Sequence, residues 1–322
     1  MESEMQTERS GILTCIRVKD VGQALALGRS AALHSPQLQR AVVVEGELPG
    51  NDRRKLSACF HHIIPMRPEH YRLGWQAKNV VHQYSPFERS LFLDSDCLVM
   101  RDLRPVFHLF RGKPVAFSAK SVPAQETGQS LFARVSLQGL RAHFQVDWWP
   151  QILGGGHFYF EQTGAADKVF ERARHWASLE LLKPFGWDQP NIADELTLQF
   201  ALVEAGLARQ CTICDFPLML WTPAVGGNPD VLGATVDGRG KDGVSFRSGE
   251  FYAVHFGGDH QNVHYRRERY RLALHSHSLE GHSAPMRGLE RLVNRRAIFG
   301  PIAYATLKTE RLRGRVARLV ET

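Results

Sequence analysis

Short runs of apolar residues alternate with longer segments of mixed apolar and polar residues along the N-terminal third of the chain. The runs at 11–18 and 41–44 are rich in β-branched residues and predict strands. Between them, Asp20 is placed to cap a helix that continues through Ala32. Two strands joined by a helix form a βαβ unit, so we expect parallel strands with a right-handed crossover.

The same alternation continues beyond this unit. It predicts further strands at 59–65, 90–93, 115–119, 157–160 and 251–258, and helices at 73–84, 165–182 and 192–205. Residues 125–145 give no clear element, and residues 259–322 have a broken helical pattern. This order predicts an open α/β sheet, which binds its ligands at the carboxyl ends of its strands.

One predicted strand ends in two acids, in the stretch Leu91-Phe92-Leu93-Asp94-Ser95-Asp96. In an extended chain alternate side chains share a face, so Asp94 and Asp96 would reach one divalent cation together. The alternative is a turn, because Asp and Ser are common turn residues. We favour the strand with a bound cation, since an unpaired carboxylate between apolar runs is costly.

Three other stretches contain candidate site residues. The glycines Gly154, Gly155 and Gly156 precede an aromatic strand and permit close approach of the backbone to a ligand, although a plain bulge has the same signature. Asp194 and Glu195 open a predicted helix, where capping is the alternative reading. His255 ends a late strand, and its imidazole would complete a carboxylate metal site unless it is structural.

Composition limits the class of protein. The chain has 322 residues, of which 43% are hydrophobic, enough for one large core or one core with an appendage. No run approaches the roughly 20 apolar residues of a membrane span, and the polar, acidic start is unlike a signal peptide. Five cysteines, an odd and scattered set, argue against a disulfide framework. We therefore expect a cytoplasmic protein.

The net charge of +7 arises largely from two arginine clusters, at 266–271 and 311–318. A basic surface attracts phosphates, acidic polymers and anionic lipid alike, so charge alone does not identify a partner. For the C-terminal segment we consider a helical cap, an anionic membrane surface and a homodimer contact. We expect no specific nucleic-acid partner.

Four stretches together resemble the GT-A glycosyltransferases, and most of all the retaining family eight, which includes glycogenin and the bacterial lipopolysaccharide galactosyltransferases. The most specific match is 91–99 followed by Asp102-Leu103-Arg104-Pro105-Val106-Phe107. Looser matches are 154–160, 194–199 and His255-Phe256-Gly257-Gly258. The resemblance implies a Rossmann-like GT-A α/β domain over residues 1–260, with a mixed, mostly parallel sheet, and a basic helical extension over residues 261–322.

The resemblance also implies a function. It indicates a metal-dependent hexosyltransferase that moves a sugar from a nucleotide diphosphate donor, a UDP-sugar, with retention of configuration. The implied cation is Mn²⁺ or Mg²⁺. The implied ligands are Asp94, Asp96 and His255; the donor-binding residues are Lys78, Asp94, Ser95, Gly154, Gly155 and Gly258; and the catalytic candidates are Asp194, Glu195 and Asp188. The acceptor stays open among sugars, glycans, lipid-linked sugars and proteins.

Two departures from the family pattern are informative. The family usually has Lys-Pro-Trp after the late glycine, with the lysine on the diphosphate, whereas here Asp259 and His260 follow Gly258. Lys78, Arg266 or Arg267 would have to supply that charge. The aromatic residue that commonly stacks on the base is also absent after the first strand, so the nucleotide is not fixed.

Two other functions compete with this one. A haloacid-dehalogenase-like phosphohydrolase also ends a strand in Asp-x-Asp, but it has Gly-Thr after the second acid, where this chain has Cys97 and Leu98. The other alternative is a non-catalytic nucleotide-binding protein that uses its basic tail for anionic partners.

Overall fold

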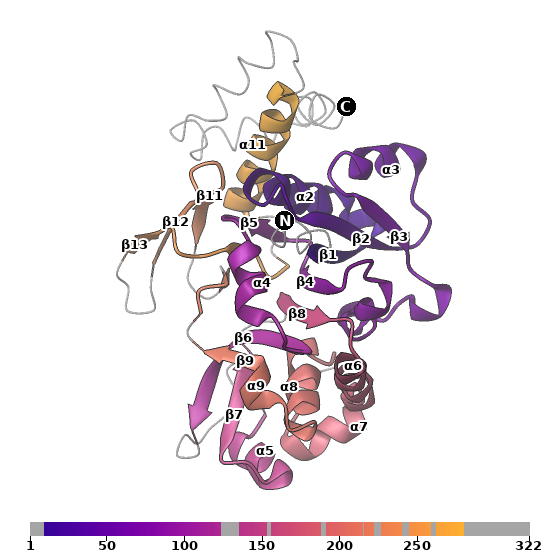
Figure 1. Ribbon diagram of the computed structural model, residues 1–322, viewed down its shortest axis with the longest axis vertical. Coiled ribbons are helices and arrows are strands. Elements are labelled where there is room, and N and C mark those ends of the chain that lie inside the picture. The colour runs from indigo at the N-terminus through magenta and orange to yellow at the C-terminus, as the bar shows by residue number, and fades with distance from the viewer. Residues whose placement is uncertain are drawn as a thin grey trace.

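The structure is a computed structural model that describes residues 10–123, 135–152, 156–187, 191–214, 216–221, 227–239, 245–258 and 262–279 (Figure 1). Its centre is an eight-stranded sheet with the order β3-β2-β1-β4-β8-β6-β7, in which β9 also pairs with β6. The strands are β1 (Ser10–Arg17), β2 (Gln39–Glu45), β3 (His62–Pro65), β4 (Arg89–Leu93), β6 (Val115–Pro123), β7 (Trp148–Ile152), β8 (His157–Glu161) and β9 (Thr212–Cys214).

The sheet is mixed and mostly parallel, as the sequence predicts. β1 lies parallel to β2 and β4, β2 to β3, and β6 to β9, whereas β8 is antiparallel to β4 and β6, and β7 to β6. The helix between β1 and β2 forms the expected βαβ unit, in which Leu13 lies opposite Ala41. Figure 1 shows β1–β3 with α2 and α3 in the upper half of the molecule, below α11, and β6, β7 and β9 with α5–α9 in the lower half; β8 lies between them beside β4.

Consecutive residues of a strand point to opposite faces of the sheet. Both faces of this sheet carry apolar side chains, and helices cover both. On β4, Leu91 lies in the hydrophobic cluster that contains Leu27 of α2 and Phe107 of α4. The adjacent Phe92 lies in a different cluster, which contains Phe170 of α6. The helices are α2 (Val21–His34), α3 (Gly50–Ser57), α4 (Arg104–Phe110), α5 (Leu137–Phe144), α6 (Gly164–Trp176), α7 (Leu179–Leu182), α8 (Asp194–Glu204) and α9 (Ala208–Cys211). The 3₁₀ helices are η1 (Val18–Asp20), η2 (Pro68–His70), η3 (Gly74–Asn79), η4 (Val81–Tyr84) and η5 (Lys183–Phe185).

A small second sheet brings the late part of the chain to the end of β4. Its order is β10-β14-β5, and β14 runs antiparallel to β5 so that His255 lies opposite Cys97. The helix α11 packs against α2, and its Tyr265 is fully buried against Phe256. These elements are β5 (Cys97–Val99), β10 (Met219–Trp221), β14 (Ala253–His255) and α11 (Val263–Leu279); a third sheet contains β11 (Asn228–Asp230), β12 (Thr235–Arg239) and β13 (Ser245–Ser248).

Three local predictions are wrong. The segment 94–96 is a turn between β4 and β5, not an extended strand, and the backbone NH of Cys97 donates to the carbonyl of Asp94 at 2.9 Å. The segment 73–84 forms η3 and η4 instead of one α-helix. The helix predicted at 165–182 is divided into α6 and α7, because Ala177 and Ser178 leave the helical conformation.

Some predictions fall outside the described residues. These are the roles of Gly154, Gly155 and Asp188, and the conformation of 280–322. The division of the chain at residue 260 stays a prediction. Across the described part of the chain, the helices are too short or too polar to cross a membrane.

Candidate active site

The acidic turn is fixed to the central sheet. The backbone NH of Asp94 donates to the carbonyl of Gly156 at 2.9 Å, which extends the pairing of β4 with β8 by one step. On the other side, the hydroxyl of Ser95 donates to the side-chain oxygen of Gln23 on α2 at 2.9 Å. The two acids therefore project from a turn that is fixed at both sides, at the carboxyl end of β4.

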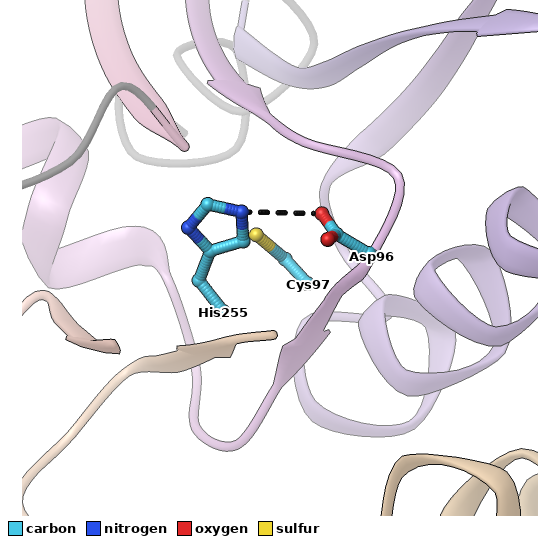
Figure 2. Close-up of side chains that lie close together, drawn as sticks. All are labelled: Asp96, Cys97 and His255. Carbon is cyan, nitrogen blue, oxygen red and sulfur yellow. Dashed lines mark ion pairs between the residues drawn. The ribbon is translucent and has the colours of Figure 1, made fainter. Parts of the chain in front are cut away.

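The late histidine meets both acids, as Figure 2 shows for Asp96. The Nε2 atom of His255 lies 3.2 Å from Oδ1 of Asp96 and 3.5 Å from Oδ2 of Asp94. The second oxygen of Asp96 accepts a hydrogen bond of 2.6 Å from the backbone NH of Gly258. The acidic turn and His255, which are distant in the sequence, thus converge because β14 pairs with β5.

Gly156 makes room for this histidine. A Cβ atom at position 156 would overlap the imidazole ring of His255. The sequence reading singled out Gly154 and Gly155 of the three glycines, whereas the described structure gives the steric reason for Gly156. Only the fold places residue 156 beside residue 255, so no local pattern could reveal this requirement.

We expect Gly156→Ala to displace the ring of His255 and to weaken cation binding at least tenfold. Overpacking of a filled site also costs about 1–3 kcal/mol of folding stability. Isothermal titration with Mn²⁺ and thermal unfolding measure both effects. Gly164→Ala is the matched control, because a Cβ at Gly164 would meet open space. An unchanged cation affinity in Gly156→Ala would show that His255 is not a ligand.

Lys78 joins the acidic turn to the first turn of α8. Its ammonium lies 2.9 Å from Oδ2 of Asp94 and 2.8 Å from Oδ2 of Asp194. The N-cap position of α8 is Ala193 and no side chain caps the helix there, so Asp194 pairs with the lysine instead of capping. Glu195 follows and shares a side-chain hydrogen bond with Asp194.

Burial and charge set the protonation of these groups. Burial lowers the pKa of Lys78, but the carboxylates of Asp194 and Asp94 outweigh it and raise that pKa overall. Burial and, to a smaller extent, the charge of Asp194 together raise the pKa of Glu195 to about 7. Near neutral pH the carboxyl group of Glu195 is therefore protonated in a large fraction of the molecules and is then able to donate a hydrogen bond.

His255 and Asp96 form a second charged pair, and Asp94 lies beside it. Burial opposes ionisation of Asp96, but the hydrogen bond from His255 prevails and lowers the pKa of Asp96 to about 2. Burial likewise disfavours a charged His255, yet the bond to Asp96 raises the pKa of the imidazole. Burial raises the pKa of Asp94, although Lys78 and His255 oppose this effect.

The donor atoms suit a divalent cation. Ligand atoms of Asp96, Cys97 and His255 all lie within 4.8 Å of one another (Figure 2). Burial and the two acids raise the pKa of the Cys97 thiol well above its usual value, which keeps the sulfur protonated and neutral. Oxygen and imidazole donors from Asp96 and His255 therefore remain, and such donors suit Mn²⁺ or Mg²⁺. Asp94 lies outside this group of three, with its Oδ2 3.5 Å from Nε2 of His255 and 2.9 Å from the ammonium of Lys78.

Other predicted residues have different surroundings. Ser95 and Gly258 lie at the acidic turn and bond Gln23 and Asp96, respectively. Arg267 is buried, bonds Glu268 and Asn228, and is therefore committed to the packing of α11.

The sequence reading missed His157, the residue after Gly156. Its ring is buried, and neither ring nitrogen has a hydrogen-bond partner among the described residues. Burial, together with the positive charges of His255 and Lys78, lowers the pKa of His157 to about 3. This imidazole is therefore neutral and adds no charge to the site.

No family model matches this chain, and no curated protein matches it in sequence. Solved structures match it in fold. The bifunctional glycosyltransferase WbbM has a TM-score of 0.51 at 13% identity, over 82% of this chain and 49% of WbbM. The galactosyltransferase LgtC, solved with donor and acceptor sugar analogs, has a TM-score of 0.46 at 14% identity, over 66% of this chain and 76% of LgtC.

Mouse xyloside xylosyltransferase 1 has a TM-score of 0.43 at 10% identity, over 66% of this chain and 87% of that protein. All three of these solved proteins are glycosyltransferases. The similarity to WbbM, of which the chain spans about half, shows that this chain has the predicted GT-A fold.

Proposed function

We propose that the protein is a metal-dependent glycosyltransferase that transfers a sugar from a nucleotide diphosphate donor. The observation that supports this most strongly is the convergence of His255 with Asp94 and Asp96 at the carboxyl end of a strand, in a GT-A fold. Ligand sites of α/β sheets lie at this edge. UDP as the nucleotide and retention of configuration follow from the family resemblance.

The proposed ligands are Asp96, His255 and Asp94. A divalent cation held there would act as a Lewis acid that neutralises the diphosphate as it leaves. Gly258 holds Asp96 through the oxygen that does not face His255, which orients that carboxylate for a ligand. A bound cation would replace the contact between Nε2 of His255 and Asp96, and the Nε2 proton would have to leave to solvent.

Lys78, Asp194 and Glu195 form the other half of the proposed site. The lysine holds the carboxylates of Asp94 and Asp194 in fixed positions, at 2.9 and 2.8 Å. We assign Asp194 and Glu195 to the sugar of the nucleotide-sugar. The carboxylate of Asp194 would accept a hydrogen bond from a sugar hydroxyl group, and the protonated carboxyl group of Glu195 would donate one. Negative charge at this position also favours an oxocarbenium-like centre in the transition state.

A thermal-shift screen of nucleotide sugars, with and without Mn²⁺, tests this proposal. A ligand that binds only the native state at a hundred times its Kd adds about 2.7 kcal/mol of stability. We expect UDP-sugars to raise the Tm by several degrees, and only when Mn²⁺ is present. If phosphate monoesters stabilise the protein and are hydrolysed while nucleotide sugars have no effect, the phosphohydrolase alternative is correct instead.

A further inference from the structure

Trp75 has a larger exposed fraction than the other exposed large hydrophobic residues in the described part of the chain. Its exposed fraction is 59%, compared with 40% for Leu109 on α4. Single exposed apolar residues are common on protein surfaces and need no function. The place of Trp75 on η3, beside the site described above, is what makes it informative.

The three faces of η3 have different neighbours. A 3₁₀ helix has three residues per turn, so side chains at i and i+3 lie one above the other. Ala77 lies on the face that is buried in the hydrophobic core. Gln76 and Asn79 lie on a second face and bond the region of α8, through the carbonyl of Ile192 at 2.8 Å and the hydroxyl of Thr197 at 3.3 Å.

The third face contains Trp75 and Lys78. The ammonium of Lys78 is buried between Asp94 and Asp194, at 2.9 and 2.8 Å. Three residues of a 3₁₀ helix rise by about 6 Å. The backbone of Trp75 therefore lies one turn before that of Lys78, and the indole is exposed to solvent.

The segment that presents this indole is anchored at both ends. Before η3, the backbone NH of Arg72 donates to Glu45 at 2.9 Å. At its end, Arg174 of α6 donates to the backbone carbonyl of Asn79 at 3.0 Å. A fixed backbone and a side chain with only two rotatable bonds give a rigid surface that loses little entropy on binding.

The position also indicates which substrate meets the indole. The charged groups form a row from Asp96 through His255, Asp94 and Lys78 to Asp194. The diphosphate is proposed at the Asp96 end. Gln76, the neighbour of Trp75 in η3, bonds the carbonyl of Ile192 two residues before Asp194, so the start of η3 lies toward the other end. A donor bound with its diphosphate at Asp96 would leave that end for the acceptor.

We propose that Trp75 is the stacking platform of an acceptor subsite and that the acceptor is a saccharide or glycan. A sugar ring has an apolar face of C–H groups, which fits the electron-rich face of an indole, and polar edges that stay in water. This inference rests on the proposed function, because it places an acceptor next to a bound donor.

The test uses the full chain with UDP and Mn²⁺ present. The probes are methyl glycosides of glucose, galactose, mannose and N-acetylglucosamine at millimolar concentration. Saturation-transfer NMR measures their binding. We expect transfer to the C–H protons of one ring face of at least one glycoside. Trp75→Ala should weaken that binding about tenfold, whereas Trp75→Phe should retain most of it.

Two controls separate the possible results. Leu109→Ala removes another exposed apolar side chain and should change nothing, and the affinity of every variant for UDP should equal that of the unmodified protein. Absence of glycoside binding, or equal binding in Trp75→Ala, would overturn the inference while UDP binding keeps the proposed function intact. A loss of UDP affinity in Trp75→Ala would show that the indole meets the nucleotide instead. If the unmodified protein binds no UDP, the proposed function itself fails.

Discussion

Asp96→Asn is expected to abolish Mn²⁺-dependent binding of UDP without unfolding the protein. The amide has the same shape, and its oxygen is still able to accept the hydrogen bond from Gly258. The substitution removes the negative charge that faces His255 at 3.2 Å and the cation. Loss of a residue that only supports a metal ligand costs about 10–100-fold in affinity, so loss of a ligand should cost at least about 100-fold.

Calorimetric titration of Mn²⁺ and UDP, together with thermal unfolding, measures these effects. Asp102→Asn is the matched control, because Asp102 lies on the same segment but pairs with Arg104 at the surface. We expect this control to bind Mn²⁺ and UDP normally. Normal binding in Asp96→Asn would remove Asp96 from the set of ligands.

Lys78→Met is expected to destabilise the fold by about 3–5 kcal/mol at neutral pH. The substitution leaves the buried carboxylate of Asp194 and the partly buried carboxylate of Asp94 without their ammonium, and removal of one partner of a buried ion pair has this cost. The raised pKa of Lys78 means that its stabilising charge is fully present below 10.5 and is lost only as pH rises through the folded-state pKa. Neutral pH is therefore the right condition for the comparison.

Urea unfolding at pH 7 measures this loss of stability. Lys183→Met is the control, because its pair with Glu180 is solvent-exposed and contributes under about 1 kcal/mol. The double variant Lys78→Met with Asp194→Asn should recover part of the stability, since one buried charge is then absent. Equal stability of Lys78→Met and the unmodified protein would show that the carboxylates find another counter-charge.

The strands were predictable because β-branched runs of this kind have few other conformations. Val42 and Val43, for example, occupy a strand that is buried on both faces, as a parallel sheet requires. The turn at 94–96 was harder, since Asp and Ser fit both a strand end and a turn. The hydrogen bond from Ser95 to Gln23 holds the turn, and it is a contact between distant segments.

The structure brings together Asp94, Asp96 and His255, which the family pattern named, and their role as metal ligands stays a prediction. The pairing of Lys78 with Asp194 had no sequence signal, because the two residues lie on different elements and meet only in the folded chain. The same holds for the steric need for Gly156 and the buried ring of His157. Short-range pattern identifies chemical groups, but tertiary packing determines which of them meet.

The segment 73–84 shows a second limit of short-range pattern. Its composition suits a helix, yet the chain adopts two 3₁₀ turns that direct Lys78 to the acids. The buried ion pairs and the bonds of Gln76 and Asn79 to the region of α8 favour this local geometry over the intrinsic preference. Such departures are expected at functional sites.

The most direct measurement of the central claim is an anomalous-scattering map from crystals grown with UDP and MnCl₂. We expect one manganese peak, coordinated by carboxylate oxygens of Asp96 and Asp94, by Nε2 of His255 and by oxygens of both phosphates of UDP. A manganese peak elsewhere, or UDP bound at this edge of the sheet without a cation, would contradict the account.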